Sequence, residues 1–113
     1  MKLDRLNLRV IECDPGRVVV GLRADFESGL FDGHFPELPL LPGVIQTHLA
    51  VKIFEAHAGS IGPFRGFKNL KFFNPIFPGQ ELMLECSRNP ETGALSFHYH
   101  HEGKTFAKGM VLL

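Results

Sequence analysis

The fold is decided by residues 42–59, PGVIQTHLAVKIFEAHAG. Pro42-Gly43 opens this segment, Gly59 closes it and no proline interrupts it, which predicts a helix over residues 44–58. Apolar residues occupy nearly every face of that helix, and a helix that is apolar all round is a buried one. We therefore expect one central helix of about four turns, wrapped by the strands that the rest of the chain forms.

Outside this segment, strand-like runs alternate with turn-forming residues. Strands are predicted at residues 6–12, 18–24, 66–73, 81–87, 95–101 and 105–113. Residues 14–17 (DPGR) and 89–93 (NPETG) have the composition of turns. The predicted order is β-β-α-β-β-β-β, an α+β fold with antiparallel strands around one buried helix.

Bulk composition bounds the class of protein. With 113 residues, the chain has room for a single domain, residues 1–113. Twelve Lys and Arg balance twelve Asp and Glu without a clustered basic run, so we expect no nucleic-acid partner. Cys13 and Cys86 lie far apart without metal-ligand spacing, and we expect two free, buried thiols.

The sequence predicts neither a signal peptide nor a membrane span. Residues 1–5 (MKLDR) are charged rather than signal-like, and no apolar run approaches the length of a membrane span. We therefore expect a cytoplasmic protein.

Residues 31–46, FDGHFPELPLLPGVIQ, carry the most informative motif. Gly-His-Phe-Pro is followed by a Pro and then by Pro-Gly at the predicted helix start. Residues 74–80, NPIFPGQ, supply a second Pro-x-x-Pro-Gly element. This pattern resembles the bacterial 3-hydroxyacyl-[acyl carrier protein] dehydratases, and Leu-Leu-Pro-Gly-Val-x-Gln is most similar to the short ApeI-like dehydratases associated with aryl polyene pathways.

The resemblance implies a hotdog fold, in which a sheet wraps around the central helix. It also implies an activity, the dehydration of 3-hydroxyacyl-ACP thioesters to trans-2-enoyl-ACP in fatty acid or aryl polyene-type biosynthesis. No cofactor is expected for this reaction.

His34 matches the position of the family's catalytic His. Dehydration removes a proton from the carbon next to the thioester carbonyl, and an imidazole is a base poised near neutrality. Gly43 matches the backbone donor to the thioester oxygen, because free N–H groups at a helix N-terminus stabilise developing negative charge. Glycine there lets the thioester approach closely.

His48 is where the sequence departs from the family. The family places a Glu or Asp at this position of the helix to help expel the hydroxyl, and that residue projects from the partner subunit. His48 as an imidazolium can protonate the leaving hydroxyl, and as a neutral ring it can orient a water or a hydroxyl. The alternative is an interior His in a protein that has lost the dehydration step.

The remaining expected site residues are substrate contacts. Substrate contacts are expected at Phe35, Pro42, Val44, Phe72 and Phe73, with the acyl tail lying along the helix among phenylalanines.

Polar residues on the helix are interpreted by their spacing. Lys52 and Glu55 are three apart and are expected to pair across one turn. Gln46 faces away from His48 by helical geometry and is expected to be a polar contact near the site entrance.

His98, His100 and His101 favour no metal site. His98 and His100 share a strand face, but no carboxylate or Cys with metal spacing accompanies them in sequence. We interpret them as solvent-facing positions.

The expected partners are an acyl carrier protein and a second subunit, in a homodimer or a higher even oligomer. Arg65, Lys68 and Lys71 either form a basic rim that steers an acidic carrier protein or belong to an ordinary exposed strand face.

Two other functions are compatible with the fold. One is acyl thioester hydrolysis, for which Asp32 and Glu55 are the nearby carboxylates. The other is a catalytically silent acyl-binding or partner subunit, which His48 in place of the family's carboxylate would indicate.

Overall fold

The computed structural model describes residues 3, 6–25, 28–31 and 40–113. Within them, the chain forms six strands and one helix: β1 (Asn7–Asp14), β2 (Arg17–Arg23), α1 (Gly43–Ala58), β3 (Gly66–Phe72), β4 (Glu81–Arg88), β5 (Leu95–His101) and β6 (Lys104–Leu112). The predicted element order is confirmed, and each boundary lies within about two residues of its prediction.

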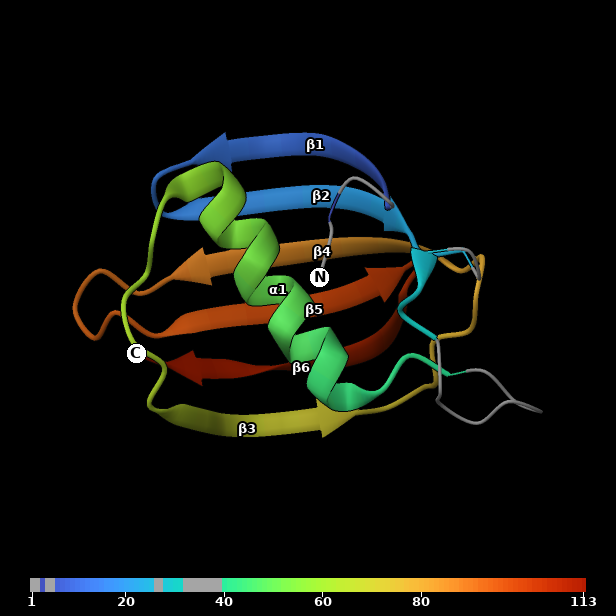
Figure 1. The fold of residues 1–113 in the computed structure, drawn as a ribbon. Coiled ribbons are helices and arrows are strands. Elements are labelled where there is room, and N and C mark those ends of the chain that lie inside the picture. The colour runs from blue at the N-terminus through green and yellow to red at the C-terminus, as the bar shows by residue number, and fades with distance from the viewer. Residues whose placement is uncertain (1–2, 4–5, 26–27, 32–39) are drawn as a thin grey trace.

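The strands form one antiparallel sheet in the order β1-β2-β4-β5-β6-β3. Strands β1 and β3 are therefore its two edges. Helix α1 crosses one face of this sheet from the β3 side to the β1 side (Figure 1). This is the hotdog arrangement that the sequence predicts, with the helix lying across one face of the sheet.

The core lies between α1 and the sheet. Alternate residues of β4 and β5, among them Leu84, Cys86, Phe97 and Tyr99, are buried against the helix. The Tyr99 hydroxyl donates a hydrogen bond of 2.6 Å to the Gln46 backbone carbonyl in the first part of α1. Complete burial raises the pKa of Tyr99 well above its usual range, so this hydroxyl remains a donor. The bond fixes the helix against the central strands.

The prediction that α1 is buried on every side is wrong. Val44 is 69% exposed, and His48 and Lys52 are exposed on the same side. The physical reason is that a single sheet covers one face of a helix and leaves the opposite face open.

In the described part of the chain, no helix is long and apolar enough to cross a membrane.

The prediction of two buried thiols is half wrong. Both cysteines are free, but Cys13 is exposed while Cys86 is buried. Cys13 lies on edge strand β1, which has a neighbour on one side only. Burial raises the pKa of Cys86 to about 12.

Candidate functional site

The start of α1 lies at the mouth of a pocket and has no side-chain cap. Pro42 is the N-cap with extended backbone (φ −61°, ψ 148°), and no side chain in the described residues caps the free N–H groups. The first intrahelical bond runs from the Gln46 N–H to the Pro42 carbonyl, at 3.0 Å. The N–H groups of residues 43–45 precede that bond, and the positive end of the helix dipole lies with them. This terminus can therefore bind an oxygen that carries negative charge.

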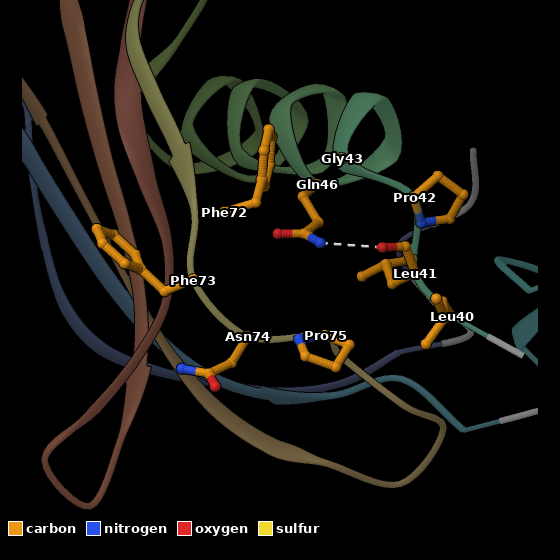
Figure 2. Close-up of a pocket in the computed structure, with 9 residues that line it drawn as sticks. All are labelled: Leu40, Leu41, Pro42, Gly43, Gln46, Phe72, Phe73, Asn74 and Pro75. Atoms are coloured by element: carbon orange, nitrogen blue, oxygen red, sulfur yellow. Dashed lines mark hydrogen bonds between the residues drawn. The ribbon is translucent and has the colours of Figure 1, made fainter.

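A pocket of 490 Å³ lies next to this terminus and is named here the Gly43 pocket. Its walls are residues 40–43, Gln46 and residues 72–75, so one wall comes from the helix start and the other from the end of β3 (Figure 2). The two walls are tied together where the Leu41 N–H donates to the Ile76 carbonyl at 2.9 Å. The lining is mostly apolar, as an acyl chain requires.

Gly43 is held in close contact with Phe72. A Cβ atom on Gly43 would lie 2.7 Å from Cζ of the Phe72 ring, which is closer than atoms pack. The absence of a side chain therefore lets the aromatic ring of β3 lie directly against the helix start, and any larger residue must displace it. Pro42, Phe72 and Phe73, the other expected substrate contacts here, line the same pocket.

Gln46 is the polar side chain in the helix wall of this pocket. It is 4% exposed, and its Nε2 donates to the Leu41 carbonyl at 2.9 Å. Its Oε1 has no hydrogen-bond partner among the described residues. In Figure 2, Oε1 points away from Leu41 into the space between α1 and β3. A buried amide oxygen without a partner is costly, and a donor on a bound ligand would satisfy it.

His48 lies in a different cavity from Gly43. The second cavity, of 430 Å³, is lined by His48 and by Val44, Thr47, Val51, Lys52, Glu55, Gly62, Phe64 and Phe67. In the described structure, no residue lines both this cavity and the Gly43 pocket. Val44, one of the expected substrate contacts, lines the His48 cavity and not the Gly43 pocket. Gly43 and His48 therefore face different cavities, although both lie on α1.

Two further expectations concern charged residues on α1 and near β3. The ion pair between Lys52 and Glu55 is absent from the salt bridges among the described residues. Arg65, Lys68 and Lys71 are all exposed, and none lines the Gly43 pocket.

His34 and Phe35, assigned above to the catalytic and substrate-binding groups, lie outside the described residues. Asp32, the carboxylate named for the hydrolytic alternative, lies outside them as well.

Sequence reasoning missed Glu85. The statement that no carboxylate accompanies His98 and His100 is wrong in space, because Glu85 of β4 lies opposite His98 of β5. Glu85 is separated from both histidines by more than ten residues in sequence, so only the pairing of β4 with β5 reveals the cluster.

Comparison with known proteins places the chain in a family. The family model described as ApeI-like, ApeI dehydratase, matches residues 10–110. A protein of Ruminiclostridium cellulolyticum named 3-hydroxyacyl-[acyl-carrier-protein] dehydratase FabZ is 38% identical over 86 residues, which are 69% of this chain and 61% of that protein. A FabZ protein of Listeria welshimeri is 34% identical over 96 residues, 78% of this chain and 67% of that one. The chain thus spans about three fifths of the first of these relatives.

Solved structures agree with this relationship. A chain of the dehydratase heterocomplex ApeI:P from Xenorhabdus doucetiae superimposes with a TM-score of 0.83 at 26% identity, covering 92% of both chains. Zebra fish thioesterase superfamily member 2 superimposes with a TM-score of 0.68 at 19% identity, covering 96% of this chain and 80% of that one, which shows a shared fold. Because the ApeI-like model covers nearly the whole sequence, the chain belongs to the ApeI-like dehydratase family.

Proposed function

We propose that this protein dehydrates 3-hydroxyacyl thioesters carried by an acyl carrier protein to trans-2-enoyl thioesters. The observation that carries the proposal is the uncapped N-terminus of α1, which opens at Gly43 onto an apolar pocket of 490 Å³. Such a terminus stabilises negative charge on a thioester oxygen, and the pocket accommodates the carbon chain. Membership of a dehydratase family selects this reaction among those that need an oxyanion site.

The proposed mechanism assigns one role to each group. His34 takes the proton from C2, and the electron pair moves toward the carbonyl oxygen, which the Gly43 N–H stabilises. The pair then returns to form the C2–C3 double bond while the C3–O bond breaks. His48 gives the leaving hydroxyl a proton, and water departs. The substrate loses one proton to His34, and its hydroxyl takes one from His48 and leaves as water. His34 then releases its proton to solvent and His48 takes one up, which restores the enzyme for the next turnover.

His48 serves this mechanism from a second copy of the chain. Within one chain, His48 and Gly43 line different cavities, so a single copy does not bring them together. Large apolar side chains are exposed along β3 and beside it, with Phe67 at 42%, Phe72 at 49% and Phe64 at 59% exposed. Pairing of two β3 edges covers these rings and continues the sheet into the partner.

The chain is accordingly expected to be a dimer. Multi-angle light scattering at micromolar concentration should give twice the mass of the chain, and Phe67→Lys in β3 should shift the population toward monomer. A wild-type monomer at that concentration would contradict the shared site, because His48 would then have no partner pocket to reach.

One assay separates the proposed function from its alternatives. Incubation with 3-hydroxyacyl-ACP and enoyl-ACP, followed by mass spectrometry of the acyl group, reports loss or gain of one water. Parallel measurement of free thiol reports hydrolysis. We expect water loss and gain without thiol release. Thiol release without dehydration would instead make the protein a thioesterase.

A silent partner subunit is the second candidate function. The chain that superimposes with a TM-score of 0.83 comes from a dehydratase heterocomplex, ApeI:P. His48 in place of a carboxylate fits a subunit that binds acyl chains without completing the reaction. This candidate predicts that the wild type is inactive alone while His48→Glu dehydrates. Activity of the wild type alone excludes it.

Gln46 provides a prediction about substrate recognition. Its buried Oε1 is expected to accept a hydrogen bond from the 3-hydroxyl group, so Gln46→Leu should weaken binding of a 3-hydroxyacyl thioester about tenfold, the equivalent of one buried hydrogen bond. The matched control is the acyl thioester that lacks the hydroxyl, whose Kd should not change. Equal loss for both ligands would mean that the substitution acts through the Leu41 contact and the pocket wall.

A further inference from the structure

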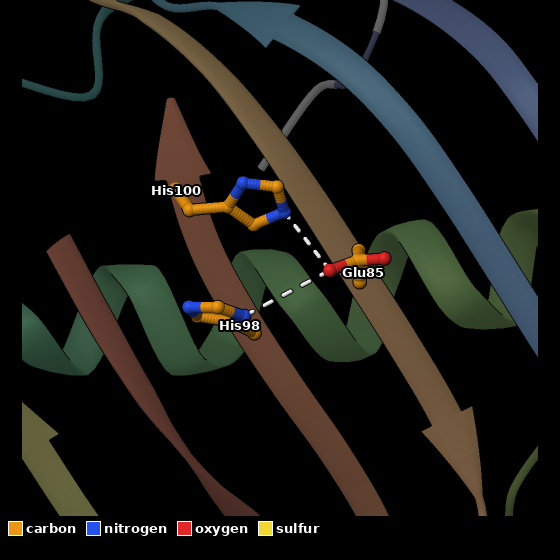
Figure 3. Close-up of side chains that lie close together, drawn as sticks. All are labelled: Glu85, His98 and His100. Atoms are coloured by element: carbon orange, nitrogen blue, oxygen red, sulfur yellow. Dashed lines mark hydrogen bonds and ion pairs between the residues drawn. The ribbon is translucent and has the colours of Figure 1, made fainter. Parts of the chain in front are cut away.

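Two histidines and a carboxylate meet on the face of the sheet opposite the helix. Along β4, Leu84 and Cys86 are buried toward α1, so Glu85 between them projects to the other face. Along β5, Tyr99 is buried toward α1, so its neighbours His98 and His100 project with Glu85. Figure 3 shows the three side chains in front of the strands, with the helix behind them.

Strand register brings the three side chains together. Glu85 is the direct partner of His98, and His100 is two residues further along the same strand. Glu85 Oε2 lies 2.9 Å from Nε2 of His100 and 3.8 Å from Nδ1 of His98. One ligand atom of each residue lies within 4.8 Å of the others. An ion bound at about 2.0–2.2 Å from each atom would occupy the space between them after small side-chain rotations.

Neighbouring groups already hold two of these side chains in position. His98 Nε2 forms a hydrogen bond of 3.0 Å with the Thr105 hydroxyl, which leaves Nδ1 directed at Glu85. Arg17 Nη2 donates to Glu85 Oε1 at 2.7 Å, which leaves Oε2 directed at the histidines. Metal-ligating histidines and carboxylates have outer partners of this kind, which fix their orientation.

We propose that Glu85, His98 and His100 form a binding site for a divalent transition metal, with Zn²⁺ as the preferred ion. Two imidazoles and one carboxylate are a ligand set that Zn²⁺ accepts, with a fourth position left for water. The three side chains are 27–37% exposed, so the site is open to solvent on one side. The sheet separates it from the Gly43 pocket, and dehydration does not depend on it.

Titration of the metal-free protein with Zn²⁺ by isothermal calorimetry tests the site. We expect saturable binding that Glu85→Gln, His98→Ala and His100→Ala each weaken beyond detection. Thr105→Val removes only the outer partner of His98 and should weaken binding about 10–100-fold. Titration with Co²⁺ should give the visible absorption bands of a four-coordinate site.

Matched variants exclude binding by other histidines. His101→Ala, on the same strand, and His34→Ala and His48→Ala, in the proposed active site, should each leave the Zn²⁺ affinity of the cluster unchanged. Circular dichroism and thermal melts confirm that each variant is folded. Absence of Zn²⁺ binding to the wild type overturns the proposal, as does binding that survives loss of both His98 and His100.

Discussion

Replacing His34 by Ala is expected to lower turnover of 3-hydroxyacyl-ACP about 10²–10⁴-fold, the usual effect of removing a general base. The imidazole takes the C2 proton, and no other group in the proposed mechanism has that role. The loss should appear in kcat rather than KM, because the acyl chain and the helix terminus at Gly43 still bind the substrate. Steady-state kinetics with a single purified acyl-ACP measure both parameters.

The matched control for this experiment is His101→Ala, which changes a histidine on β5 that lines neither cavity. It should retain wild-type turnover, and both variants should melt within a few degrees of the wild type. A His34→Ala protein that turned over like the wild type would remove the base from the mechanism and with it the assignment of the site.

Mixing two inactive variants should restore activity. His34→Ala and His48→Phe each disable every active site of their own dimers. If each site takes His34 from one chain and His48 from the other, a mixed dimer contains one intact site and one site lacking both groups. Statistical exchange at equal amounts should then restore roughly a quarter of wild-type activity, since half of the dimers have half of their sites intact.

The control is each variant mixed with itself under the same exchange conditions, which should stay inactive. No recovery in the mixture, with exchange confirmed by mass spectrometry of tagged chains, would place His34 and His48 in the same site of one chain. A His48→Phe protein as active as the wild type would show that His48 has no catalytic role. His48→Glu should raise the rate if the surrounding geometry already suits a carboxylate.

The fold was predictable because the chain carries consistent local signals. Turn residues separate the strands, and the strand predicted at residues 95–101 has the same bounds as β5 in the structure. The helix bounds follow from Pro42 and Gly59, which both lie just outside α1. Each of these signals acts within a few residues, which is the range over which backbone conformation and turn chemistry operate.

The predictions that failed depend on contacts between residues that lie far apart in the sequence. Hydrophobicity indicates that a helix face is buried but not by what, so α1 was expected to be buried on every side, whereas Val44 is 69% exposed. Cys13 was expected to be buried because the residue pattern of a strand does not show whether it lies at the edge or in the centre of the sheet. Glu85 was missed beside the histidines because cross-strand register joins residues that no local pattern connects.

The close fit of Phe72 over Gly43 has a consequence for substrate entry in the proposed dimer. The ring lies against the helix start, so a thioester that comes to lie beside Gly43 must displace an aromatic side chain. In the proposed dimer, the β3 edge of the second copy covers the same ring, so this displacement takes place at the subunit interface. Substrate entry and subunit pairing are therefore expected to act on one side chain.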